Sequence, residues 1–180
     1  MRVSIIFLIF LSCQSHYTPK PKAYFKINFP EKKYIILEDK KMDFSFKYPV
    51  YSEIDIKSNS KFIDVHFPEF YGTLHLTYVN LKGNLSDHIE QSRSLAYKHN
   101  NQADAISEQV FISSIDNVYG MLYDYSGVTA TSSQFYLTDS VNHFFRGSFY
   151  FNTEINDSIA PINIFIKEDI RFLIESLRWK

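Results

Sequence analysis

Residues 143–151 read HFFRGSFYF, and this stretch says most about how the 180-residue chain folds. Successive side chains of a strand point to opposite faces. Phe145 and Phe149 therefore share one face, and Phe144 and Tyr150 lie on the other. A strand that is apolar on both faces belongs to a sheet covered on both sides. We expect core packing under two helices, with one sheet face left partly open to a partner as the alternative.

Period-two alternation marks further strands before this one. They are expected at residues 43–48, 50–56, 62–67, 73–80, 109–114, 118–126 and 129–138. The last three long strands, up to residue 151, are joined by short links, which indicates an antiparallel meander. The order of strands, helix, strands and helix predicts an α+β single domain, with an antiparallel β-sheet sandwiched with two main helices.

Two segments have helical periodicity. The first begins near Asn84 or Ser86 and has an apolar side that Ser92 interrupts. The second has capping candidates at residues 156–158 and Pro161 in its first turn. Its apolar positions repeat at helical spacing and are Ile162, Ile166, Ile170, Leu173, Ile174 and Leu177. Residues 177–180 are expected to form a short closing strand.

The N-terminus has the pattern of a bacterial lipoprotein signal. An Arg at position 2 is followed by a short apolar run that ends at Ser12 and Cys13, the single cysteine. We expect residues 1–12 to be a signal peptide, Cys13 to carry lipid such as palmitate, residues 13–33 to be an acylated, poorly packed Lys/Pro-rich spacer, and residues 34–180 to be the domain. The alternative is a short buried element in which Cys13 is an ordinary small hydrophobe.

Composition excludes some classes of function. Residues 13–33 are basic, with five lysines against Glu31, and the remainder is acidic. The basic segment either lies on anionic headgroups or is a soluble linker. An acidic domain does not favour a nucleic-acid partner. With one cysteine, the mature chain has no internal disulfide.

Motifs that carry catalytic or metal chemistry are missing from the sequence. The six histidines have no metal-binding spacing, and no phosphate loop or nucleophilic Gly-x-Ser-x-Gly turn occurs. Asp55, Asp64 and Asp124 are interpreted as solvated strand residues, and Glu168-Asp169 as an exposed helix pair. We therefore expect no enzyme activity, no catalytic residues, no cofactor and no metal.

The aromatic strands are the remaining candidate for a binding surface. Tyr119, Tyr123 and Tyr125 project to one face of their strand. Arg146 lies on the Phe144 side of its own strand, and Tyr and Arg are favoured at interfaces. An alternative function is a small-molecule- or glycan-binding lipoprotein, with or without hydrolysis. It calls for a pocket that gathers Arg146, His143 or His75 with carboxylates.

Short stretches spread over nearly the whole mature chain are similar to those of a known family. They are residues 17–22, 46–51, 72–76, 95–99, 103–106, 134–140, 143–147 and 177–180. With these stretches, the chain resembles the gliding-motility lipoprotein GldD family of Bacteroidota. The resemblance implies a role in the envelope machinery for gliding and type IX secretion, and the family has no established enzymatic activity that could be transferred to this chain. The one functional residue that the resemblance assigns is the acylated cysteine, which corresponds to Cys13. Residues 43–49 and the terminal helix with its final strand also resemble a Mog1/PsbP-type sandwich.

These features together lead to a functional hypothesis. The chain is expected to be a non-catalytic lipoprotein, anchored to a membrane through Cys13, that faces the periplasm and contacts other subunits of a gliding or secretion complex. Gln14 lacks the acidic character that retains lipoproteins at the inner membrane, so the outer membrane is slightly favoured. Ser140 and Ser158 lie in Asp-Ser-aliphatic patterns that resemble O-glycosylation sites of the phylum.

Overall fold

A computed structural model of the chain describes residues 26–57, 61–98, 103–127, 129, 131–153 and 159–180. In these residues, the strands are β1 Tyr34–Leu37, β2 Phe44–Pro49, β3 Glu53–Lys57, β4 Phe62–Phe67, β5 Gly72–Asn80, β6 Ala105–Ser113, β7 Val118–Ser126, β8 Thr131–Thr138, β9 His143–Phe151 and β10 Arg178–Trp179. The helices are α1 Leu85–Tyr97 and α2 Ala160–Ser176, with a short 3-10 turn at Pro68–Phe70. The expected α+β domain with two helices is confirmed.

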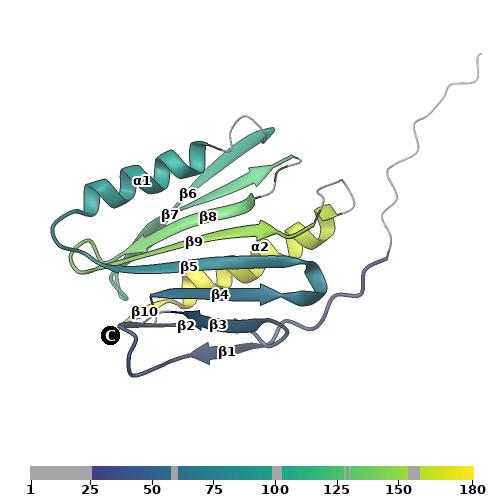
Figure 1. Cartoon of the computed structure of the whole chain (residues 1–180), viewed down its shortest axis with the longest axis horizontal. Coiled ribbons are helices and arrows are strands. Elements are labelled where there is room, and N and C mark those ends of the chain that lie inside the picture. Colours follow the sequence, from purple (N-terminus) through teal and green to yellow (C-terminus); the bar gives the residue numbers. More distant parts are fainter. Residues whose placement is uncertain (1–25, 58–60, 99–102, 128, 130, 154–158) are drawn as a thin grey trace, which may run out of the picture.

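One seven-stranded sheet organises the domain, in the order β3-β4-β5-β9-β8-β7-β6, with every described pair antiparallel. Strands β3 to β5 and β6 to β9 are two meanders, and α1 connects them. Pairing of β5 with β9 joins the meanders over nine residue pairs. Helix α1 lies over one face of the sheet and α2 over the other (Figure 1).

A small three-stranded sheet, β1-β2-β10, packs beside α2. The closing strand predicted at the C-terminus is present, since Arg178 and Trp179 pair with Ser45 and Phe44 of β2. Strand β1 was not expected as a separate element. Its pairing with β2 adds an edge to the small sheet.

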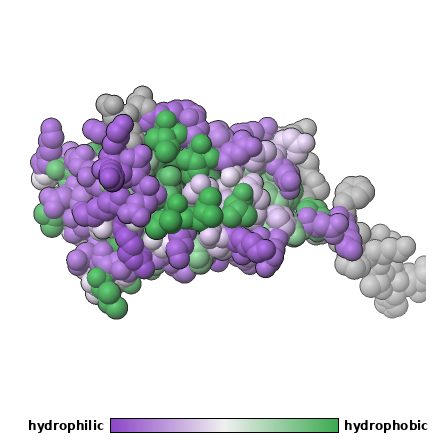
Figure 2. All heavy atoms as spheres, turned by 90° about the horizontal axis from the view of Figure 1, so that it is seen from below, coloured by the Kyte–Doolittle hydropathy of each residue, from purple (hydrophilic) through white to green (hydrophobic). Residues whose placement is uncertain are grey.

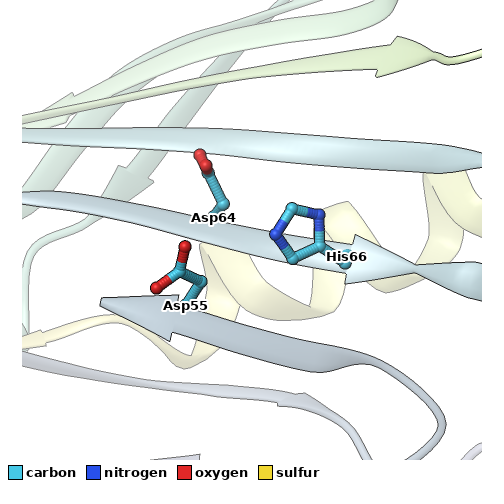
Figure 3. Close-up of side chains that lie close together, drawn as sticks. All are labelled: Asp55, Asp64 and His66. Atoms are coloured by element: carbon cyan, nitrogen blue, oxygen red, sulfur yellow. The ribbon is translucent and has the colours of Figure 1, made fainter. Parts of the chain in front are cut away.

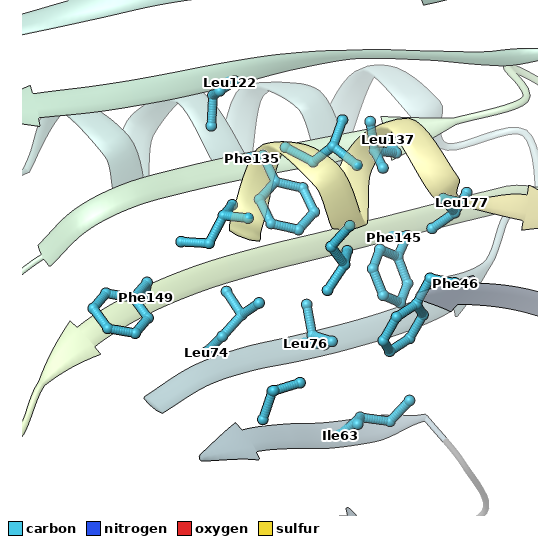
Figure 4. Packing of buried hydrophobic residues seen from close by; sticks show 14 of the residues in the cluster. Phe46, Ile63, Leu74, Leu76, Leu122, Phe135, Leu137, Phe145, Phe149 and Leu177 are labelled. Atoms are coloured by element: carbon cyan, nitrogen blue, oxygen red, sulfur yellow. The ribbon is translucent and has the colours of Figure 1, made fainter. Parts of the chain in front are cut away.

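The main hydrophobic core lies between the large sheet, α2 and β2 (Figure 4). Phe145 and Phe149 of β9 are completely buried in it, as are Phe44 and Phe46 of β2. At Gly147 between them, an added Cβ would lie 2.2 Å from the ring of Phe135. A side chain there has no room, so glycine lets this ring pack directly on the backbone of β9.

Helix α1 covers part of the opposite face and contacts β8 and β9. Ser92 does not interrupt its packing: it is 5% exposed, and Ala96 one turn later is fully buried. Small residues at both positions let the helix approach the sheet closely. The Tyr125 hydroxyl of β7 donates to the backbone carbonyl of Ala96 at 2.9 Å, which fixes the end of α1.

Helix α2 contains a buried carboxylate, so the expectation of an exposed Glu168-Asp169 pair is wrong for Asp169. Asp169 is 2% exposed. Its Oδ1 accepts hydrogen bonds from Lys32 Nζ at 2.9 Å and Tyr34 OH at 2.8 Å, and its Oδ2 accepts from Tyr51 OH at 2.5 Å. Burial and the neighbouring carboxylate raise the pKa of both tyrosines.

The end of the expected spacer also packs on α2. Phe29 stacks on Phe165 at 4.4 Å between ring centroids, and Lys32 donates to the carbonyl of Phe165 at 2.8 Å. Poor packing therefore does not extend to residue 33. The capping candidates at residues 156–158 lie outside the described residues, and α2 begins after Ile159.

Candidate functional site

The candidate site lies where the α1 face of the sheet continues past the helix. Strands β3, β4 and β5 present alternate polar side chains on this face, among them Asp55, Asp64 and His75. The register aligns these three residues across the strands, because Asp55 pairs with Asp64 and Asp64 with His75. A polar strip therefore adjoins α1.

An open pocket of about 300 Å³ lies between α1 and strands β5 and β9. Its lining residues are His75, Thr77, Leu95, Arg146, Ser148 and Tyr150. Pairing of β5 with β9 forms its floor by placing His75 opposite Ser148 and Thr77 opposite Arg146. The pocket thus combines residues that are about 70 positions apart in the chain.

Arg146 is the charged group of this pocket. It is half-buried, and its Nη2 donates to Gln134 Oε1 at 3.2 Å and to Ser148 Oγ at 3.3 Å. Among the described residues, Arg146 forms no ion pair with a carboxylate. Burial lowers the pKa of Arg146, although the phenols of Tyr150 and Tyr125 oppose this effect.

His75 is oriented by a buried carboxylate at the edge of the pocket. Its Nδ1 lies 2.7 Å from Asp64 Oδ1, and Asp64 also accepts a hydrogen bond from Lys57. Asp64 is only 7% exposed, so the expectation of a solvated carboxylate is wrong. Burial alone would raise the pKa of Asp64, but the hydrogen bonds from Lys57 and His75 outweigh burial and hold the pKa below its usual range.

Asp124 was also expected to be solvated, and this is wrong too. It lies on the α2 face and is 7% exposed. Arg171 Nη2 donates to its Oδ2 at 2.6 Å, and Ser133 Oγ donates to its Oδ1 at 2.5 Å. Lys167 Nζ lies 3.7 Å from Oδ1. Two cations of α2 thus share one carboxylate of β7. This contact holds α2 against the sheet and is interpreted as structural.

Asp55, Asp64 and His66 form a group with metal-binding side chains (Figure 3). One potential ligand atom from each lies within 4.8 Å of the others. Sequence spacing did not indicate the group, because strand pairing creates it. The Lys57 ammonium contacts both carboxylates and therefore competes with a metal ion for this group.

His143 does not belong to the pocket. It begins β9 and lies by the small sheet, where its ring stacks on Trp179 at 5.0 Å and its Nδ1 lies 2.8 Å from Tyr78 OH. The expected pocket was to gather Arg146, His143 or His75 with carboxylates; the structure brings together Arg146 and His75, and none of the lining residues is acidic. These residues were selected by residue type, which carries no information on register.

Of the three expected modification sites, the structure describes Ser140. Cys13 and Ser158 lie outside the described residues. Ser140 is exposed in the turn between β8 and β9, with a φ of 71°. The Asp139 carboxylate holds this turn by accepting backbone hydrogen bonds from residues 141–143, which lower the pKa of Asp139 although burial opposes them.

The fold is a PsbP-like α+β sandwich. The domain is similar to the cyanobacterial PsbP (CyanoP) of Synechocystis sp. PCC 6803, with a TM-score of 0.56, 10% sequence identity and coverage of 84% of this chain and 95% of that chain. A Bacteroides thetaiotaomicron structure aligns with a TM-score of 0.39 and 13% identity over 81% of this chain and 48% of that one. No curated protein sequence matches the chain.

Residues 14–179 match the gliding motility lipoprotein GldD family, and the chain belongs to this family. It is therefore a lipid-anchored lipoprotein of the cell envelope with a role in gliding motility. Within the described residues, neither helix has the length and hydropathy that crossing a bilayer requires.

Proposed function

We propose that the chain is a non-catalytic component of the gliding and type IX secretion machinery, held through acylated Cys13 with its domain in the periplasm. The observation that supports this proposal most strongly is the family match over residues 14–179. The outer membrane is the favoured location, because Gln14 and not an acidic residue follows Cys13.

The tether limits how far the domain reaches. Phe29 already packs on Phe165, so fifteen residues, 14–28, lie between Cys13 and the domain. A fully extended segment of this length spans at most about 55 Å. Confinement near one membrane raises the effective concentration of the domain for a membrane partner without any added contact. This is the mechanism we propose for the anchor.

A surface for other subunits lies close to the end of the tether. Ile35 and Ile36 of β1 are 45% and 55% exposed. Strand β1 is also an edge of the small sheet. Figure 2 views the molecule from the side of β1 and shows hydrophobic residues gathered on this side. An apolar edge strand is suited to contact with another protein.

Substitution of the anchor tests the proposal. Cys13→Ala should move the protein from the membrane fraction to the soluble fraction while circular dichroism stays unchanged. Gln14→Ala is the matched control, because it keeps the acylated cysteine and should stay with the membrane. A Cys13→Ala protein that stays in the membrane after a high-salt wash contradicts the anchor.

Crosslinking in intact cells tests the second part of the proposal. Other subunits of the gliding or secretion machinery should be recovered with the wild-type chain, and Cys13→Ala should lower their yield. Equal yields from both proteins contradict a mechanism based on tethering.

A further inference from the structure

Among the described residues, Arg146 on the α1 face of the sheet is a cation without a matching anion. On the α2 face, Arg171 and Lys167 share the carboxylate of Asp124. Arg146 on the opposite face has only neutral acceptors among the described residues, Gln134 and Ser148. Removing a guanidinium from water without a counter-charge is unfavourable. Binding of an anion beside Arg146 would offset this cost.

The remaining wall of the pocket suits the same ligand. Thr77, Ser148 and Tyr150 contribute hydroxyl groups, and none of the lining residues is acidic. Gln134 behind Arg146 is 2% exposed, and its Nε2 has no hydrogen-bond partner in the described part of the chain. Hydroxyl groups therefore line the pocket beside the guanidinium, and Asp64, the carboxylate that contacts His75, lies on β4 and is not among the lining residues.

His75 is placed to take part. Its Nδ1 is held by Asp64, so its Nε2 lies on the side of the ring away from that carboxylate. The imidazole and the guanidinium line the same pocket. A protonated His75 would add a second positive charge and a donor for the ligand. Asp64 is a positioning residue, because its carboxylate fixes the orientation of the His75 ring.

We propose that this pocket binds a small molecule through an oxyanion, a carboxylate or phosphate group, with Arg146 as the principal contact. The planar guanidinium matches both groups because it offers paired N–H donors. A volume of about 300 Å³ accommodates a small ligand. Binding is independent of the lipid anchor, so loss of the tether leaves it intact.

The experiment uses the full chain in non-ionic detergent, titrated with inorganic phosphate in one arm and succinate in the other. Calorimetry should give saturable binding of the wild type to at least one probe, and the probe that binds more tightly identifies the class of oxyanion. Arg146→Gln should weaken binding about tenfold or more. Arg93→Gln is the matched control, since it removes the same charge from an exposed position of α1 that does not line this pocket, and it should alter Kd less than about twofold.

A second variant keeps the test decisive if Arg146→Gln fails to fold. Thr77→Trp fills the pocket and leaves Arg146 in place, so binding should be lost while the fold is retained. The proposal is overturned if the wild type binds neither probe at about 20 mM. It is equally overturned if Arg146→Gln or a folded Thr77→Trp binds as tightly as the wild type.

Discussion

The two faces of the seven-stranded sheet come from the same strands but are covered differently. On one face, α2 and the small sheet enclose a continuous apolar core. On the other, α1 contacts β8 and β9, and the polar strip on β3 to β5 extends beyond it. Two sets of charged side chains show the difference. Under α2, Asp124 and Asp169 are held in networks, whereas beside α1 Arg146 lines an open pocket.

Buried charges show the contrast most clearly. Asp169 and Asp124 each have several donors on the α2 face. Arg146 has two long contacts to neutral groups on the α1 face. A saturated network contributes to stability, whereas an unmatched charge costs stability and is available for a ligand.

Two neighbouring phenylalanines give the largest expected effect. Phe145 points into the α2 core and is fully buried, and Phe144 points to the α1 face and is 3% exposed. Phe145→Ala should lower the free energy of unfolding by about 4 kcal/mol because it leaves a cavity in a closed core. Phe144→Ala should cost less, because the α1 side can relax. Urea denaturation measures both, and equal losses would mean that the faces are equally sealed.

Asp169→Asn tests the network at α2. It keeps the size of the side chain but removes the charge that Lys32 and two tyrosines contact. Leaving a partly buried cation without its partner should cost about 3 kcal/mol. The neighbouring Glu168, whose side chain is 59% exposed, supplies the control Glu168→Gln, which should change stability by less than about 0.5 kcal/mol. A similar result for both variants would show that Asp169 is not a stabilising centre.

A matched pair of arginines compares the two faces directly. Arg171→Met should destabilise the protein by about 2 kcal/mol, since it removes a charge-assisted hydrogen bond to buried Asp124. Arg146→Met should stay within about 0.5 kcal/mol of the wild type, because it removes a half-buried cation that has no ion pair in the described residues. Thermal unfolding in the absence of phosphate measures the stability of both variants. A loss of stability in Arg146→Met as large as in Arg171→Met would contradict the proposed difference between the two faces.

The smallest effect is a pH dependence on the α1 face. Lys57 and His75 hold the pKa of Asp64 below its usual range despite burial. Between its folded and unfolded pKa values the unfolded state binds more protons, so stability rises with pH. The contribution is complete above about pH 5 and is lost as pH falls through the folded pKa. Wild type should therefore lose more stability than Asp64→Asn between these limits, and parallel profiles would argue against the shift.

Local alternation was enough to predict most strands. The expected bounds of β4, β7 and β9 agree with the structure, because alternation of side chains is a property of neighbouring residues. Strand β1 was missed, and its exposed isoleucines give no clear period. The pairing of β5 with β9 also escaped prediction, since it joins segments about 70 residues apart.

Prediction of the candidate site was less complete for the same reason. Arg146 and His75 were selected by residue type, and the sheet register then placed them in one pocket with Ser148. His143 was selected on equal grounds but lies beside Trp179. The misjudged carboxylates have partners on other elements, so their burial could not be read from adjacent residues.

The sequence by itself determined the α+β class, the two apolar faces of the central strand and the family, because all of these depend on residue types and short spacings. Tertiary structure alone decided which side of the sheet is sealed, why Asp169 is buried, and that Arg146 shares a pocket with His75. The physical reason is that burial and charge compensation depend on contacts between residues distant in the chain, and these contacts exist only once the sheet register is formed.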